Sequence, residues 1–296
     1  MPIAVAAILL SVAGPLAGGA DAPLPWSYFG EAQPGRTPEV FAPELIPGAG
    51  LRLHGAPVVS PDLRRICWSV IPPAIMSSVW AEGAWSIPEP LPLPLAGVQA
   101  PAFSPDGRRL YFQGIDVEGA GGVDLWWVDL TSEAWSEPTS VGPAVNTPGL
   151  ESQPSLAADG TLYYTGTLEG VGMNRGIYRA LSTPDGFAPP ELLGPQINTE
   201  FIDYCPSITP DGTCLLFASS RPSLEEEFRL FVAFAGPDGS WSEPVSLHEA
   251  LGLAASARFP QVSPDGKYLF FVSEGRAYWV DFAVVPGLGP AGEGHE

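Results

Sequence analysis

The sequence has 296 residues, of which 45% are hydrophobic, so it is long enough to bury a sizeable core. It contains 33 Asp and Glu against 13 Lys and Arg, which gives a formal charge of −20. Because phosphate backbones and anionic membranes attract clustered basic side chains, this charge excludes nucleic acid and argues against membrane insertion of the mature domain. The 34 Gly and 35 Pro fall at regular turn positions between apolar runs, which indicates an all-β protein.

The N-terminal segment has the composition of an export signal. Residues 3–16 are apolar, and small residues follow at positions 17–20. This length fits the hydrophobic region of a signal peptide and is short for a membrane span. We therefore predict that residues 1–20 direct export to the periplasm or the outside of a bacterial cell, although no Lys or Arg precedes Arg36. A retained anchor and a packed N-terminal segment are the alternatives, and residues 21–37 are expected to lead into the domain.

A hairpin motif recurs five times along the chain. It is clearest at 259–272, where Ser-Pro-Asp-Gly separates two strands, and the other copies lie at 57–69, 101–113, 154–165 and 206–218. Pro presets φ near −65° at the second turn position, and Gly accepts the left-handed conformation that follows. The first copy has Leu63 in place of Gly. Since a left-handed Leu costs roughly 1–2 kcal/mol, we expect that turn to differ in detail.

The spacing of the hairpins indicates a propeller. The turn aspartates are 44, 53, 52 and 54 positions apart, and they are Asp62, Asp106, Asp159, Asp211 and Asp265. Periods of this length, with four strands in each, are typical of propeller blades. The second strand of each hairpin is apolar on both faces, as packing between neighbouring blades requires. We expect the fourth strand of each blade at a segment in which an aromatic residue is followed closely by proline. A fourth strand lies at the edge of its sheet, where proline is tolerated although it has no amide hydrogen to donate to a neighbouring strand. These aromatic-Pro segments begin at Trp85, Trp135, Phe187 and Trp241.

The two ends of the chain complement each other. The last repeat has no fourth strand, whereas the segment beginning at Phe41 matches the aromatic-Pro segments and precedes the first hairpin. We therefore predict an all-β, five-bladed β-propeller of four-stranded antiparallel blades over residues 38–282, in which residues 38–47 complete the last blade. Six blades are the alternative. Residues 283–296 are expected to form a flexible tail, and the protein to be a monomer.

The repeat resembles a known family. The pattern Pro-x-x-Ser-Pro-Asp-Gly-(Lys/Arg)-x-(Leu/Ile)-(Tyr/Phe)-Phe is similar to the WD40-like PD40 repeat of TolB-type propellers, and residues 135–160 resemble its longer form in exported bacterial proteins. The resemblance covers residues 38–282 and implies a propeller that serves as a binding or scaffold module. No counterpart of the N-terminal domain of TolB is found, so a role in the Tol–Pal envelope system is not implied.

Standard catalytic motifs are absent from the sequence. It contains no nucleophile elbow, Walker loop, His-Glu-x-x-His or dinucleotide fingerprint. Cys67, Cys205 and Cys214 lack the spacing of metal ligands and are expected to be small core residues. His248 has no second His nearby in sequence, so a metal site is not expected there.

Alignment of the five repeats gives the candidate site residues. One level, where the first strands enter the central channel, holds His54, Glu151 and Asp203, and the next holds Gln99, Tyr204 and Arg258. Two carboxylates and an imidazole around one axis can hold a divalent cation or act as acid and base on a sugar. The alternative is that these side chains hydrate the channel mouth and pair with Arg258. Asp116 and Arg221 are candidates in loops after second strands, or else stabilise those loops.

These observations predict an exported, non-enzymatic module that binds a protein, peptide or glycan at one face of the central channel. No cofactor is expected, except that a divalent cation is possible at the axis. The first alternative is a carbohydrate-active enzyme, a glycoside hydrolase or lyase, that uses Glu151 and Asp203 with His54 or Arg258. A purely structural module is the second. If the axial carboxylates bind ligand or metal, Glu151→Gln and Asp203→Asn are expected to weaken that binding without lowering thermal stability.

Overall fold

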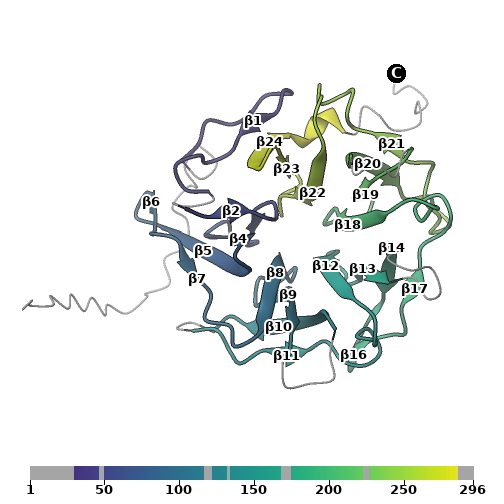
Figure 1. Cartoon of the computed structure of the whole chain (residues 1–296), viewed down its shortest axis with the longest axis horizontal. Coiled ribbons are helices and arrows are strands. Elements are labelled where there is room, and N and C mark those ends of the chain that lie inside the picture. The colour runs from purple at the N-terminus through teal and green to yellow at the C-terminus, as the bar shows by residue number, and fades with distance from the viewer. Residues whose placement is uncertain are drawn as a thin grey trace, which may run out of the picture.

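The computed structural model describes residues 30–46, 50–116, 122–131, 134–167, 175–222 and 227–285. Five small antiparallel sheets stand around a central axis, with their first strands innermost (Figure 1). The expected five-bladed β-propeller is therefore confirmed. The predicted export signal lies outside the described residues, so export stays a prediction. Within the described ranges, no helix is long and apolar enough to cross a membrane.

The blades follow one another in chain order. Blade 1 contains β2 (Arg52–Leu53), β3 (Val58–Val59), β4 (Arg65–Ile71), β5 (Ala74–Ala81), β6 (Ala84–Trp85) and β7 (Glu89–Pro90). Blade 2 contains β8 (Ala96–Phe103), β9 (Arg109–Ile115), β10 (Asp124–Asp129) and β11 (Thr139–Ser140). Blade 3 contains β12 (Glu151–Leu156), β13 (Leu162–Thr167), β14 (Arg175–Ala180) and β17 (Glu191–Leu192), with a hairpin of β15 (Ser182–Thr183) and β16 (Gly186–Phe187).

Blades 4 and 5 share this plan. Blade 4 contains β18 (Asp203–Ile208), β19 (Cys214–Ser219), β20 (Arg229–Phe234) and β21 (Val245–Ser246). Blade 5 contains β22 (Ala257–Val262), β23 (Tyr268–Ser273), β24 (Arg276–Asp281) and, from the other end of the chain, β1 (Glu39–Val40). A 3₁₀ turn, η1 (Phe282–Val284), follows β24.

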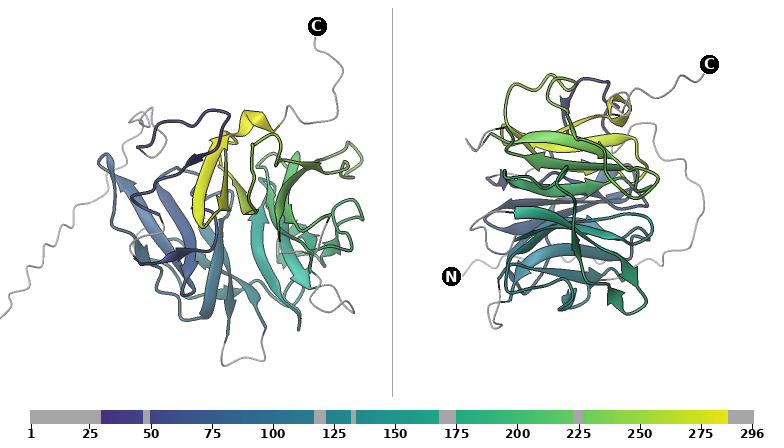
Figure 2. Two further views of the ribbon diagram at one scale, coloured as in Figure 1. Left: turned by 45° about the horizontal axis from the view of Figure 1, so that its top comes forward. Right: turned by 90° about the vertical axis from the view of Figure 1, so that its right-hand side faces the viewer.

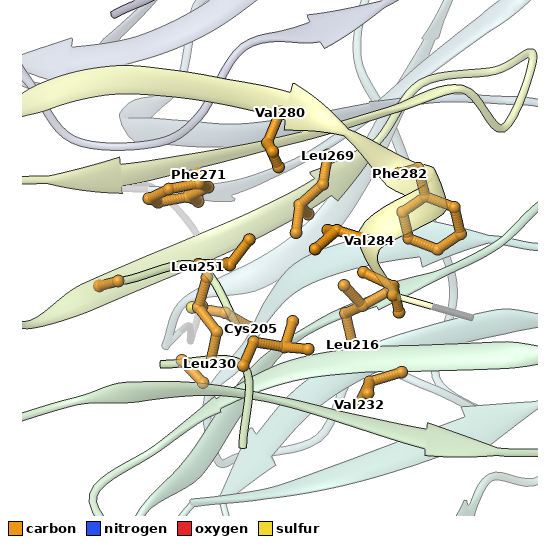
Figure 3. Close-up of a cluster of buried hydrophobic side chains, with 14 of the residues drawn as sticks. Cys205, Leu216, Leu230, Val232, Leu251, Leu269, Phe271, Val280, Phe282 and Val284 are labelled. Carbon is orange, nitrogen blue, oxygen red and sulfur yellow. The ribbon is translucent and has the colours of Figure 1, made fainter. Parts of the chain in front are cut away.

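The core lies between the blades. Every residue of β19 and of β23 is buried, because each of these second strands is covered by a neighbouring blade on both faces. Leu215 packs in the cluster with blade 3, whereas the adjacent Leu216 packs with Leu269 and Phe271 of blade 5 (Figure 3). Burying each such side chain stabilises the fold by about 1.5–3 kcal/mol. The three cysteines are also buried and free, as expected.

The N-terminal strand closes the ring. β1 pairs antiparallel with β24, and the Phe41 amide donates to the carbonyl oxygen of Ala277 at 2.9 Å. Figure 1 and the left view of Figure 2 both show the purple N-terminal segment beside the yellow C-terminal strands. Phe41 is buried, with its ring centroid 5.0 Å from those of both Phe270 and Trp279. The predicted shared blade is confirmed.

The sequence comparison wrongly equated Phe41 with the aromatic residue that begins each aromatic-Pro segment. The Phe41 amide bonds to β24 as the Val141 amide bonds to Leu125 of β10, so Phe41 corresponds to Val141. Trp135 lies six residues before Val141 and forms only an isolated bridge with Leu130. The fourth strands therefore begin after the aromatic-Pro segments. Both positions require a bulky apolar side chain near proline, which is why the two patterns look alike.

The first turn also differs from the expectation. Leu63 is left-handed with φ 58°, and its amide donates to the Ser60 carbonyl at 2.8 Å, as the Gly107 amide does to Ser104 at 2.9 Å. The Leu63 turn thus has the geometry of the others. The Leu63 side chain packs against the cluster between blades 5 and 1, and this contact offsets the roughly 1–2 kcal/mol cost of the left-handed conformation.

Phe41→Ala tests whether closure of the ring stabilises the domain. Removing a fully buried aromatic ring costs about 3–5 kcal/mol, which for a domain of this size lowers the melting temperature by roughly 10 °C. Thermal unfolding followed by circular dichroism measures this. Ile87→Ala is the control, because the Ile87 side chain is 84% exposed. Equal melting temperatures for Phe41→Ala and the control would show that β1 does not contribute to the cooperative unit.

Candidate functional site

The first strands carry a repeated irregularity where they line the axis. In blades 2 to 5 a non-glycine residue with φ between 47° and 56° precedes a proline, and the strand register shifts there. Proline suits the position because it has no amide hydrogen that needs a ladder partner. The displaced amides bond to the neighbouring blade instead: Ala100 donates to Ser69 Oγ at 2.8 Å, and Cys205 to Thr165 Oγ1 at 2.9 Å. The bulges thus join adjacent blades around the axis.

On the side where the first strands enter, the axis holds a small cavity of about 30 Å³, which has room for about one water molecule. We call it the strand-entry cavity. Of the candidates, His54 and Gln99 line it. The His54 ring lies against Phe259, with 5.5 Å between ring centroids, and burial together with the charges of Arg258 and Arg52 lowers the pKa of His54. Gln99 Nε2 donates to the Val70 carbonyl at 3.3 Å.

Tyr204 and Arg258 are not among the residues that line this cavity. Tyr204 is buried, with its ring centroid 4.8 Å from that of Phe228, and burial raises the pKa of Tyr204 well above its ordinary value. The Arg258 guanidinium lies 4.7 Å from the Phe228 ring centroid. Among the described residues, Arg258 forms no ion pair with the axial carboxylates, contrary to the pairing considered from the sequence.

Glu151 caps the connection that leads into its own blade. Its two carboxylate oxygens accept the Thr147 amide at 3.0 Å and the Thr147 hydroxyl at 2.6 Å. The side chain is 2% exposed. Burial raises the pKa of Glu151, and the charge of Asp124 raises it further, against the two Thr147 hydrogen bonds that lower it. The negative charge that acts on Glu151 is therefore that of Asp124 in blade 2, whereas the alignment of the repeats predicted Asp203.

Asp203 repeats this arrangement one blade later. It accepts the amide and the hydroxyl of Thr199, both at 2.7 Å, and is fully buried. Arg221 completes the cluster: its Nη2 lies 2.7 Å from Asp203 Oδ1 and 2.6 Å from the Ile197 carbonyl oxygen, and its Nη1 donates to Gln196. Arg221 therefore fastens the connection after blade 3 to blade 4. Its role as a loop-stabilising residue explains all these contacts.

The predicted axial group does not converge. Among the described residues, no three His, Cys, Asp or Glu side chains lie close enough to hold a metal ion. His54 lines the strand-entry cavity, whereas Glu151 and Asp203 bind their own threonines. The candidate Asp116 follows β9 near Asp124, whose pKa is raised by burial and then by the charge of Asp116. The alignment placed Glu151 and Asp203 correctly at equivalent positions, at the start of the first strands of blades 3 and 4. It misplaced His54, whose amide bonds to the Ser69 carbonyl and which therefore corresponds to Tyr204, opposite Ala218.

The larger axial cavity lies on the opposite side, where the hairpin turns are. This turn-side cavity has a volume of about 270 Å³ and is bordered by all five blades. Its lining includes the repeated turn prolines, among them Pro61, Pro105, Pro210 and Pro264, together with Val58, Ala102, Phe103, Ser155, Ser207, Gln261 and Val262. None of its lining residues is titratable. The sequence identified the prolines as turn formers, but no motif marked them as the wall of a cavity.

Comparisons with known proteins assign no specific function to the chain. No protein-family model and no curated protein matches the sequence. Similar solved structures include TolB from Acinetobacter baumannii, with 16% identity and a TM-score of 0.47 over 76% of this chain and 53% of that chain. Another is a gluconolactonase from Xanthomonas campestris, with 13% identity and a TM-score of 0.45 over 84% of this chain and 96% of that chain.

The hydrazine synthase of Kuenenia stuttgartiensis is also similar, with 16% identity and a TM-score of 0.49 over 71% of this chain and 34% of that chain. The chain thus spans about half of the TolB chain and a third of the hydrazine synthase chain that it matches. The protein is a β-propeller, and its resemblance to the PD40 repeat stays a prediction.

The Asp203–Arg221 pair predicts a large loss of stability on substitution. Asp203→Asn should lower the free energy of unfolding by about 3 kcal/mol, because it leaves a largely buried guanidinium without its counter-charge. Urea unfolding measures the loss. Asp129→Asn is the matched control, since Asp129 pairs with Arg109 at the surface and should cost less than about 1 kcal/mol. Equal stabilities for Asp203→Asn and wild type would return Asp203 to the list of ligand-binding candidates.

The raised pKa of Glu151 predicts a pH dependence. Below its ordinary pKa of 4.5 the carboxyl is protonated in both the folded and unfolded chains. As the pH rises above 4.5 the unfolded chain ionises first, so the protein loses stability relative to Glu151→Gln until the folded carboxyl also ionises. Urea midpoints of the two proteins, compared from about pH 4 to about pH 7, reveal this change. A constant difference across that range would mean that Glu151 is solvated.

Proposed function

We propose that the protein is a non-enzymatic binding module, and that its protein or peptide ligand inserts an uncharged apolar group into the turn-side cavity. One observation carries the proposal: a cavity of about 270 Å³ lies on the axis, bordered by every blade and lined without a titratable side chain. Concave, mainly apolar sites with a few polar groups are typical of ligand binding. A rigid ring is well suited to hold such a site, since no single loop has to order itself.

The neutral lining favours binding over the glycoside hydrolase or lyase considered above. Most glycoside hydrolases use a pair of carboxylates beside the substrate, and the elimination catalysed by a lyase needs a titratable base there. Glu151 and Asp203 begin the first strands of blades 3 and 4, and their oxygens accept hydrogen bonds from Thr147 and Thr199 in the preceding connections. Neither carboxylate lines the turn-side cavity or the strand-entry cavity.

The polar groups of the turn-side cavity favour a peptide over a glycan. Ser155 Oγ accepts the Ile208 amide at 3.0 Å, and Ser207 Oγ accepts the Val262 amide at 3.2 Å. Each of these hydroxyls therefore joins two blades and keeps only its own hydrogen and one lone pair, which is little for the many hydroxyls of a sugar. The Gln261 amide remains as an orienting group beside an apolar wall. An aliphatic side chain or a proline of a peptide fits such a site best.

The apolar segment at residues 3–16 supports a location outside the cytoplasm. The charge of −20 keeps the domain soluble there and disfavours anionic partners. We therefore place the binding module in the bacterial envelope or the medium.

A random dodecapeptide display library tests the proposal. Peptides enriched on the wild-type protein are synthesised, and their dissociation constants are measured by fluorescence anisotropy. Val262→Glu places a charge in the turn-side cavity and should weaken binding at least tenfold, since no partner in the cavity compensates the buried carboxylate. Ile87→Glu adds the same charge at an exposed position and should leave binding unchanged.

Melting temperatures of both variants establish that they are folded. No enrichment above a selection on empty support, or equal affinity of the enriched peptides for Val262→Glu and wild type, would contradict peptide binding at the turn-side cavity.

A further inference from the structure

A cavity larger than either axial cavity borders the turn-side cavity and runs outward between blades 2 and 3. This interblade groove has a volume of about 840 Å³. The two cavities share Ser104 and Pro105 of the blade 2 turn and Leu156 and Ala158 of blade 3 as lining residues. A ligand seated at the axis can therefore continue into the groove past these four residues.

The blade 2 wall of the interblade groove is electrically balanced. The Arg109 Nε atom lies 3.0 Å from Asp129 Oδ1, and the guanidinium lies 3.9 Å from the centroid of the Trp127 ring. Asp106 Oδ1 accepts the amide of Arg108, whose positive charge lies beside that carboxylate. On this wall each carboxylate thus has an arginine near it.

The blade 3 wall differs. Asp159 and Asp185 are exposed, and neither forms an ion pair among the described residues. Asp159 accepts the Thr161 amide at 2.9 Å, which fixes the turn but does not neutralise its charge. Asp185 lies in the tip of the β15–β16 hairpin, which forms the outer part of this wall. The groove therefore presents two uncompensated negative charges on one side.

We propose that the interblade groove binds a basic side chain of an extended peptide whose apolar residue occupies the turn-side cavity. This inference rests on the proposed function and specifies its ligand. The peptide runs from the axis outward, and its Lys or Arg faces Asp159 and Asp185. Charge complementarity with this wall selects a cationic segment, and the net charge of −20 steers such a segment toward the protein.

The aromatic residues of the groove disfavour a glycan as its occupant. Sugars stack on open ring faces, but Arg109 covers one face of Trp127. The rings of Tyr111 and Phe187 meet edge to face, with 6.4 Å between their centroids. Apart from Arg108 and Arg109, which lie near carboxylates of their own wall, the polar groups of the groove are mainly carboxylates and hydroxyls, which suit the amide backbone and the cation of a peptide.

A pair of double variants tests the inference on peptides from the same display selection. Asp159→Asn with Asp185→Asn removes both charges from the blade 3 wall while keeping the shape of the side chains. Asp211→Asn with Asp238→Asn is the matched control, because these residues hold the equivalent turn and hairpin of blade 4 and do not line the groove. The enriched peptides should contain Lys or Arg and should bind the first variant at least fivefold more weakly and the control unchanged.

Two further measurements identify the source of the loss. A synthetic peptide with its Lys or Arg replaced by Gln should show no difference between wild type and Asp159→Asn with Asp185→Asn. The difference for the parent peptide should shrink in about 0.5 M salt, because exposed charges are screened.

The results separate this inference from the proposed function. Peptides that lose affinity for Val262→Glu but bind Asp159→Asn with Asp185→Asn as tightly as wild type would overturn the role of the groove and leave binding at the turn-side cavity intact. Enriched peptides without any basic residue would overturn it as well. Failure of all peptides to bind wild type would contradict both.

Discussion

The structure depends on the burial of the second strands on both faces. Adjacent residues such as Leu215 and Leu216 pack against different neighbouring blades, so no blade can cover its own apolar surface. A linear array of such blades would leave one exposed apolar face at each end. Closure removes both faces at once, and β1 provides it by completing blade 5 beside β24. The ring is therefore a condition for the stability of every blade.

Closure also determines what the axis can do. The first strands approach one another, and their bulged amides are satisfied by Ser69 and Thr165 of neighbouring blades. Charged side chains at this level turn away from the axis to cap the connections between blades, as Glu151 and Asp203 do. The axis is left with amides, small hydroxyls, apolar side chains and the imidazole of His54, and it widens on the turn side. A neutral axial cavity is thus a consequence of how the blades are joined.

The repeats in the sequence predicted the number of blades, their strand order and the origin of the closing strand, because hairpin turns and doubly buried strands have strong local signatures. They could not predict side-chain direction. Glu151 and Asp203 occupy equivalent positions, but each is held by its own threonine, Thr147 or Thr199, and neither lines an axial cavity. The left-handed Leu63 was missed for a similar reason, since its cost is offset by a contact with residues distant in sequence. The two cavities arise from several blades together, and no single motif marks them.

The central claim is that ring closure belongs to the cooperative core of the protein. Native-state hydrogen exchange tests it at one amide, because the Phe41 amide bonds to the Ala277 carbonyl across the closure. We expect the Phe41 amide to exchange with the same opening free energy as the amide of Leu216, which lies in the middle of a buried second strand. Exchange of Phe41 by a local opening of much lower free energy, with Leu216 still protected, would contradict the claim.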